Sequence, residues 1–163
     1  DLFLTGNHSV EDFLHDLHER RRHYSGFNLL LGDSQQLWHF NSLTGRAKPL
    51  AEGLHGLSNA DLDTPWPKLQ RAKQALHNGL HEPHPQMLFK LLADPTRAAD
   101  AELPQTGIGL TGERLLSSVF IASVTYGTRA STALIVNADG SRVLAERTFG
   151  SNGNCLGEVV LHC

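Results

Sequence analysis

The sequence has 163 residues, of which 40% are hydrophobic and 19% are charged, and its formal net charge is −3. These values indicate one globular domain and exclude a disordered chain. The slight acidic excess argues against a nucleic-acid-binding surface, and no apolar run approaches the ~20 residues of a membrane-spanning helix.

The first half of the chain combines one helical pattern with several strand patterns. Ser9, followed by Asp12, is similar to a capping box, and apolar residues then recur at helical spacing. Turn residues at 32–34 separate two apolar runs, which predicts a hairpin whose first strand is buried on both faces if it is central. The predicted elements are an apolar lead at 1–4, a helix at 10–23, strands at 27–31 and 37–40, a polar connection at 45–51 and a strand at 54–58.

The second half carries the strongest hairpin signal, because Asp139 and Gly140 lie between two β-branched runs. The predicted elements are helices at 69–80 and 86–92, a loop at 93–105, a strand at 115–124, strands at 130–137 and 142–149, a flexible turn at 150–153 and a strand at 156–161. Strands in two antiparallel sets with covering helices predict an α+β fold.

The cysteines, Cys155 and Cys163, form no C-x-x-C motif and no disulfide framework. The segment between them reads as extended and would hold their Cα atoms too far apart for a bridge. We therefore expect a reducing, cytoplasmic environment.

Residues 55–68, HGLSNADLDTPWPK, form the most informative stretch. The pattern predicts a strand end, a polar turn and a helix that begins at the prolines flanking Trp66. Such a junction directs side chains and backbone N–H groups into a cleft. The alternative is an ordinary connecting loop with Asp63 or Thr64 as the helix N-cap.

Residues 55–68 resemble the signature of the NRDE family, also called the transport and Golgi organisation family. The segments HYSGFNLLLGDSQQLWHFNS (23–42), LPQTGIGLTGERLLSSVFI (103–121) and YGTRASTALIV (126–136) also resemble blocks of that family, in the same order. The Met-Cys start and the Asn-Arg-Asp-Glu motif of the family are not in this sequence. We therefore expect that residues 1–163 are the C-terminal two-thirds of a longer protein, whose N-terminal segment is not part of this sequence.

The family resembles the N-terminal-nucleophile hydrolases, whose fold is a four-layer αββα sandwich with two mainly antiparallel sheets. The resemblance implies an amide (C–N) hydrolase or acyltransferase whose nucleophile is a Cys absent from this chain. The implied partner is a small amide or acyl ligand. The alternative is a non-catalytic protein that binds or traffics haem or an acyl ligand.

Two catalytic residues follow from the resemblance to related acylases. Asn59 matches an asparagine that donates to the oxyanion, and its amide supplies N–H groups without a charge. Arg129 matches an arginine beside the nucleophile, where a guanidinium lowers the pKa of a thiol. An asparagine that bonds its own turn and an exposed arginine at a strand start are the structural alternatives.

Four further residues are candidates for substrate binding: Ser58, Asp61, Trp66 and Ser131. Ser131 has the same strand parity as Arg129. Helix capping is the competing role for Asp61, as for Asp63, and packing is the competing role for Trp66. Although the chain has 10 histidines, with His77 and His81 at helical spacing, their pattern predicts no metal site and no cofactor.

Overall fold

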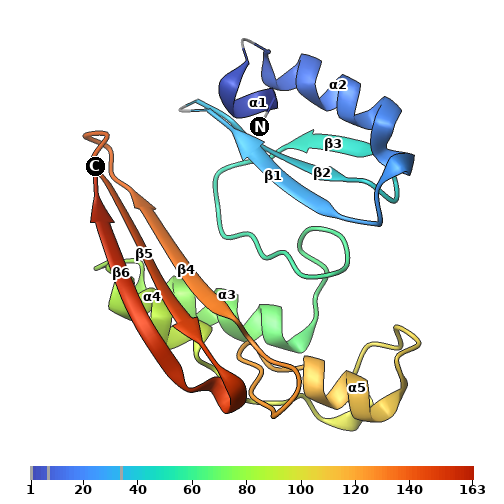
Figure 1. The fold of residues 1–163 in the computed structure, drawn as a ribbon, viewed down its shortest axis with the longest axis vertical. Helices are drawn as coiled ribbons and strands as arrows, with labels where there is room; N and C mark the ends of the chain where they lie inside the picture. The colour runs from blue at the N-terminus through green and yellow to red at the C-terminus, as the bar shows by residue number, and fades with distance from the viewer. Residues whose placement is uncertain (1, 7, 34) are drawn as a thin grey trace. The chain divides into compact units, whose positions relative to one another are not determined.

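The computed structural model of the protein describes residues 2–6, 8–33 and 35–163. The chain forms two compact units, residues 1–64 and residues 65–163. Each unit contains a three-stranded antiparallel sheet with helices packed on one face and its own apolar core (Figure 1). The mixed α and β character predicted from the sequence is confirmed.

Unit 1 follows the predicted order of one main helix and a hairpin. Its elements are α1 (Leu2–Thr5), α2 (Val10–Arg20), a 3₁₀ turn (Arg21–His23), β1 (Asn28–Gly32), β2 (Leu37–Asn41) and β3 (Arg46–Pro49). The Ser9 hydroxyl oxygen accepts a hydrogen bond from the backbone N–H of Asp12, so the predicted cap of α2 is confirmed. Residue 1 of the predicted lead and residue 34 of the predicted turn lie outside the described residues.

The core of unit 1 lies between α2 and one face of the sheet. Val10 and Leu14 of α2 pack against Leu31 of β1 and Phe40 of β2, and Phe40 is completely buried. The sheet order β1-β2-β3 makes β1 an edge strand, with Leu30 exposed on its other face. Burial of this strand on both faces, expected for a central strand, is therefore not found.

Strand β3 occupies residues for which a polar connection was predicted, so that prediction was wrong. The Asn41 side-chain oxygen accepts from the backbone N–H groups of Leu43 and Thr44, and Gly45 has a φ of 67°. This tight turn returns the chain alongside β2. All four residues of β3 are exposed, so the strand carries no apolar alternation to reveal it.

The strand predicted at 54–58 is absent from the described structure, and these residues belong to a loop. The backbone N–H of Gly56 donates to the Asp63 carboxylate, and the N–H of Asp63 donates to the Gly56 carbonyl. Because these backbone groups are satisfied within the loop, the segment needs no neighbouring strand.

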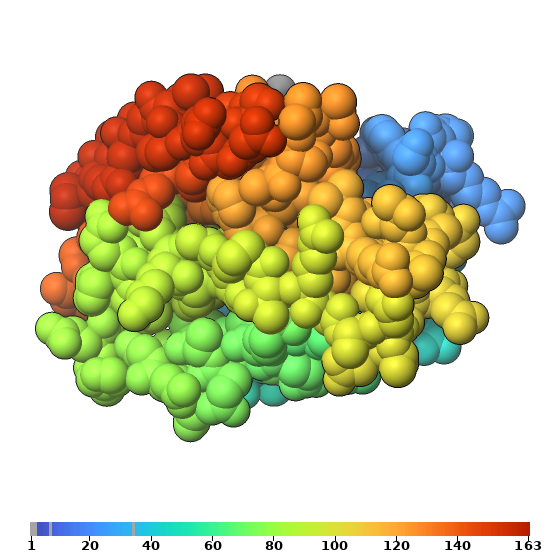
Figure 2. Space-filling model, turned by 90° about the horizontal axis from the view of Figure 1, so that it is seen from below, coloured from blue at the N-terminus to red at the C-terminus, as the bar shows by residue number. Residues whose placement is uncertain are grey.

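Unit 2 contains the strongly predicted hairpin and the predicted helices. Its elements are α3 (Pro67–Gly79), α4 (Pro85–Leu92), a 3₁₀ turn (Asp100–Glu102), α5 (Gly109–Leu116), β4 (Ala130–Val136), β5 (Arg142–Phe149), a 3₁₀ turn (Ser151–Gly153) and β6 (Cys155–His162). Phe89 of α4 packs against Ala133 and Ala145 of the sheet. Figure 2 shows unit 2 from the side where the helical residues (green) border the strands (orange and red).

The strand predicted at 115–124 was wrong, because α5 ends at Leu116 and a loop follows. The Ser117 hydroxyl donates to the Arg114 carbonyl and accepts from the Ala98 N–H. Serine side chains that bond nearby backbone groups compete with a strand ladder. Helix α5 is not predicted from the sequence pattern, because Gly109 and Gly112 have low helix propensity.

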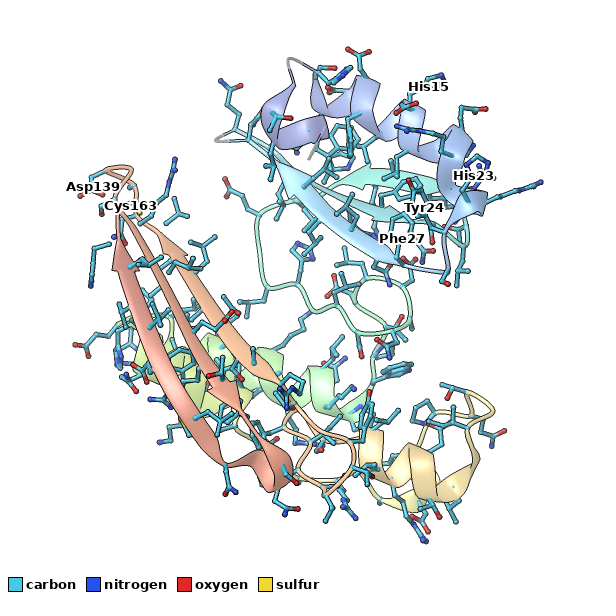
Figure 3. All side chains as sticks on the ribbon, viewed as in Figure 1. His15, His23, Tyr24, Phe27, Asp139 and Cys163 are labelled. Atoms are coloured by element: carbon cyan, nitrogen blue, oxygen red, sulfur yellow. The ribbon has the colours of Figure 1, made fainter. Side chains whose placement is uncertain are left out.

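Strand β6 begins at Cys155 and ends one residue before Cys163, so the segment between the cysteines is extended, as predicted. Both thiols are free and exposed, and Cys163 lies at the same end of the sheet as the β4–β5 turn residue Asp139 (Figure 3). Cys163 exchanges two backbone hydrogen bonds with Arg142.

Candidate functional site

A pocket of about 590 Å³ in unit 1 brings together three of the predicted site residues. Ser58, Asn59 and Asp61 line it from the loop that follows β3. Phe27 lines it from the start of β1, where its ring lies 6.0 Å from that of Tyr24 (Figure 3). The complete lining is Gly26, Phe27, Asn28, Asn41, Leu43, Thr44, Leu57, Ser58, Asn59, Ala60 and Asp61.

The pocket lies on the face of the sheet opposite the apolar core. Asn28 pairs with Asn41 across β1 and β2, and His39 lies two residues before Asn41. Side chains two residues apart on a strand share a face. These three polar residues therefore lie on one side, while Leu31 and Phe40 face α2 on the other.

Asn28 connects this polar face to the loop. Its Nδ2 donates to the carbonyl oxygens of Ala60 at 2.9 Å and of Ser58 at 3.4 Å. Its Oδ1 lies 2.9 Å from Nε2 of His39, whose side chain is only 1% exposed. Burial lowers the pKa of His39, while the Asp61 carboxylate opposes this shift and Lys48 adds to it.

Asp61 is the charged side chain of the pocket lining. Its Oδ1 accepts a hydrogen bond from Asn41 Nδ2 at 3.2 Å and lies 3.8 Å from Nδ1 of His39. Partial burial would raise the pKa of Asp61, but hydrogen bonds from the Asn41 side chain and the Leu62 backbone, with the charge of Lys48, keep it below its ordinary value. Asp61 is therefore a carboxylate at neutral pH.

Asn59 is an exposed residue of this loop, and hydrogen bonds of His55 connect the loop residues on either side of it. His55 Nδ1 lies 2.7 Å from the Asp63 carboxylate, and its Nε2 lies 2.9 Å from the Ala51 carbonyl oxygen. Asp63 has a φ of 59°, a left-handed conformation that aspartate tolerates better than most residues.

Helix capping by Asp63 or Thr64, the alternative role considered for this segment, is not found. The N-cap of α3 is Trp66, which makes no side-chain capping bond. Pro67 follows at the first helical position and has no N–H to cap. Asp61 and Asp63 instead bond to residues before the helix, within unit 1.

Trp66, Arg129 and Ser131 belong to unit 2. The half-buried Trp66 ring has the Lys68 ammonium 5.6 Å from its centroid. Arg129 is exposed just before β4, and its carbonyl accepts from the Phe149 N–H. Ser131 is buried on the sheet face that packs against α4. Because Asn59 and Arg129 lie in separate units, their convergence on one site stays a prediction.

Comparison with known proteins places this sequence in a family. Residues 2–151 match the family model described as Transport and Golgi organisation 2. The chain belongs to this family. It is 32% identical over 165 residues to the Transport and Golgi organization protein 2 homolog of Bos taurus, and 30% identical over 164 residues to that of Homo sapiens. The Mus musculus Transport and Golgi organization 2 homolog is 28% identical over 163 residues.

Each of these alignments covers 90% of this chain but only 59% of the relative. The family predicted from residues 55–68 is thus confirmed, and the match to the Transport and Golgi organisation 2 family includes the pocket and the residues of α3 to β5. The names of these relatives state no chemical reaction.

Sequence reasoning missed Asn28, His39 and Asn41 as residues of the site. A signal was present, because Asn28 interrupts the apolar run before Leu29, and His39 and Asn41 alternate with Trp38 and Phe40. Polar residues at alternate positions of an apolar strand mark the face away from the core.

Across residues 2–6, 8–33 and 35–163, no group of three or more histidine, cysteine or acidic residues could hold a metal ion. In the same ranges, no helix has the length and apolar character needed to cross a bilayer.

Proposed function

We propose that the complete protein is an amide (C–N) hydrolase or acyltransferase and that the unit 1 pocket receives the reacting carbonyl group. The observation that carries this proposal is the gathering of Ser58, Asn59 and Asp61 around one pocket with the Asn28 and Asn41 amides. Amide and hydroxyl groups recognise an amide substrate, and a side-chain N–H of Asn59 can donate to an oxyanion.

The proposed reaction is acyl transfer to a cysteine thiolate outside these 163 residues, as the family resemblance implies. The sulfur bonds to the carbonyl carbon, and the carbonyl electron pair moves to oxygen, where Asn59 donates a hydrogen bond. The electron pair of the oxyanion re-forms the C=O bond as the C–N bond breaks, and the amine nitrogen takes up the proton that the thiol released. Water or another acceptor releases the acyl group from sulfur.

The other residues have supporting roles in this proposal. Arg129 lies beside the thiol and favours its thiolate form. Ser58, Asp61, Trp66 and Ser131 contact the substrate. The exposure of Arg129 supports its availability to a neighbouring group.

The αββα sandwich of N-terminal-nucleophile hydrolases is the fold that we propose for the complete protein. Each unit is a helix layer on one face of an antiparallel sheet, which is half of such a sandwich. The β4–β6 sheet also carries exposed apolar side chains on the face away from α4, which another layer would cover. These side chains are Leu134, Val136, Leu144, Val159 and Leu161.

The test uses the complete protein with a panel of N-acyl para-nitroanilides and acyl thioesters. Asn59→Ala should lower kcat by about 10²–10³-fold with little change in KM, because an oxyanion donor acts mainly in the transition state. Asn154→Ala, which changes an exposed asparagine of unit 2, is the matched control. Equal turnover by the wild type and Asn59→Ala would remove the catalytic role of Asn59.

If the complete protein hydrolysed none of these compounds, the result would contradict the proposed enzymatic activity. Saturable binding of haem or acyl-CoA by that protein would then favour the alternative, a carrier of haem or an acyl ligand.

A further inference from the structure

His39 is a buried titratable group that the proposed reaction does not use. Its side chain is 1% exposed, and it lies on the face of β2 that points away from the apolar core. A buried imidazole loses its hydration, so its polar atoms need partners inside the protein. The partner of Nε2 is Asn28 Oδ1, at 2.9 Å.

The hydrogen-bond pattern around Asn28 determines which His39 nitrogen carries a proton. The carbonyl oxygens of Ser58 and Ala60 can only accept, so the Asn28 atom that faces them must be its NH₂ group. The other amide atom, facing His39, is therefore the oxygen. His39 must then donate through Nε2–H, and the neutral form leaves Nδ1 unprotonated toward Asp61, 3.8 Å away.

The two carbonyl groups held by Asn28 belong to the residues immediately before and after Asn59. A single side-chain amide thus anchors the backbone on both sides of the proposed oxyanion donor. If His39 stopped donating, the Asn28 oxygen would be left without its partner, and only the two donated bonds would hold the amide in place. An amide that rotated to pair its oxygen elsewhere would break its bonds to the two carbonyls and release the segment.

We propose that His39 is a positioning residue that acts through Asn28 to hold residues 58–60, and so the Asn59 side chain, in place. The proposal deepens the function above and rests on it for the catalytic consequence. The hydrogen-bonded relay itself is a property of unit 1 and can be measured without a substrate.

The first measurement is hydrogen exchange in the complete protein, read at the amides of residues 57–61. His39→Leu removes the donor at similar volume, and exchange there should become about tenfold faster or more, relative to β5. His39→Gln places an amide N–H near the position of Nε2, and exchange should stay within about threefold of the wild type. His18→Leu is the matched control, because His18 is a half-buried histidine of unit 1 that contacts the Gly45 carbonyl instead.

The second measurement is the ¹⁵N spectrum of the imidazole, which reports the protonated nitrogen. We expect His39 in the Nε2–H form at neutral pH, and Asn28→Asp should convert it to the doubly protonated form, because a carboxylate would then face Nε2. An Nδ1–H tautomer in the wild type would overturn the proposal. Equal exchange rates at residues 57–61 in His39→Leu and His39→Gln would also overturn it, because they would show that the His39 side chain acts only through packing.

Turnover separates this proposal from the proposed function. If the enzyme is confirmed, His39→Leu should lower kcat more than it changes KM, and His39→Gln should restore most of it. If Asn59→Ala leaves turnover unchanged but the exchange and tautomer results are as expected, the positioning role of His39 stands and the catalytic role of Asn59 fails. If His39→Gln restored slow exchange at residues 57–61 but not turnover, the link between the position of this segment and catalysis would be overturned.

Discussion

The buried, neutral His39 should make the stability of unit 1 depend on pH. Burial lowers the pKa of His39 below its ordinary value of 6.5, so the unfolded chain binds a proton before the folded chain does as the pH falls. The free energy of unfolding should therefore decrease below about pH 6.5, by at most about 1.4 kcal/mol per pH unit. Asp61 acts in the same direction at lower pH, because its folded pKa is also lowered.

Denaturant unfolding of the complete protein between pH 7.5 and pH 5.5 tests this expectation. The loss of stability across this range should be smaller in His39→Gln than in the wild type, because glutamine does not titrate. The rest of the sequence is identical in the two proteins, so its contributions cancel in the difference. Identical losses in the two proteins would show that His39 is not a source of the pH dependence.

Residue identity alone could predict part of the site. Ser58, Asn59 and Asp61 were predicted as site residues from their motif, and the structure brings them to one pocket. Asn28, His39 and Asn41 could not be weighed in the same way, because their common face depends on the register of β1 against β2. Register is a property of the folded sheet, and a shift of one residue would reverse each face.

At the scale of elements, the contact between α3 and α5 offers a direct stability test. The Lys68 ammonium of α3 donates to the carbonyl of Leu116, the last residue of α5, at 2.9 Å, and burial lowers the pKa of Lys68. A cation at a helix C-terminus satisfies a carbonyl that has no partner within the helix. Lys68→Met keeps the apolar stem and should reduce the free energy of unfolding by about 1–3 kcal/mol.

Thermal unfolding of the complete protein measures this change, with Lys68→Arg as the control that keeps the charge. An unchanged midpoint for Lys68→Met would mean that the hydrogen bond contributes nothing to stability. Lys68 also approaches the Trp66 ring, so a larger loss would include that contact.

The elements differ in how strongly their own residues specify them. The hairpin of β4 and β5 was predicted because Asp139 and Gly140 define a turn between two β-branched runs. Strand β3 and helix α5 were missed, because contacts outside each segment hold it in place. Strand β3 pairs with β2, and the carbonyl of Leu116 at the end of α5 accepts from Lys68 of α3. Tertiary contacts of this kind override local propensity.

For the whole molecule, the proposed sandwich predicts that the apolar face of the β4–β6 sheet is covered in the complete protein. Leu134 is 60% exposed on this face. Leu134→Asp should then destabilise the complete protein by about 2–4 kcal/mol, because it would bury an unpaired charge. Val124→Asp, in an exposed loop of the same unit, should change stability by less than about 0.5 kcal/mol. Equal, small effects of both substitutions would show that this face lies open.

We propose that Asn59 and Arg129 serve one reaction site, and a crystal structure of the complete protein is the sharpest test of this assignment. We expect the Asn59 amide and the Arg129 guanidinium both to lie within about 6 Å of the same cysteine sulfur, the range in which a charge shifts a thiol pKa. Separation of the two side chains on opposite sides of the molecule, with no cleft joining them, would contradict it.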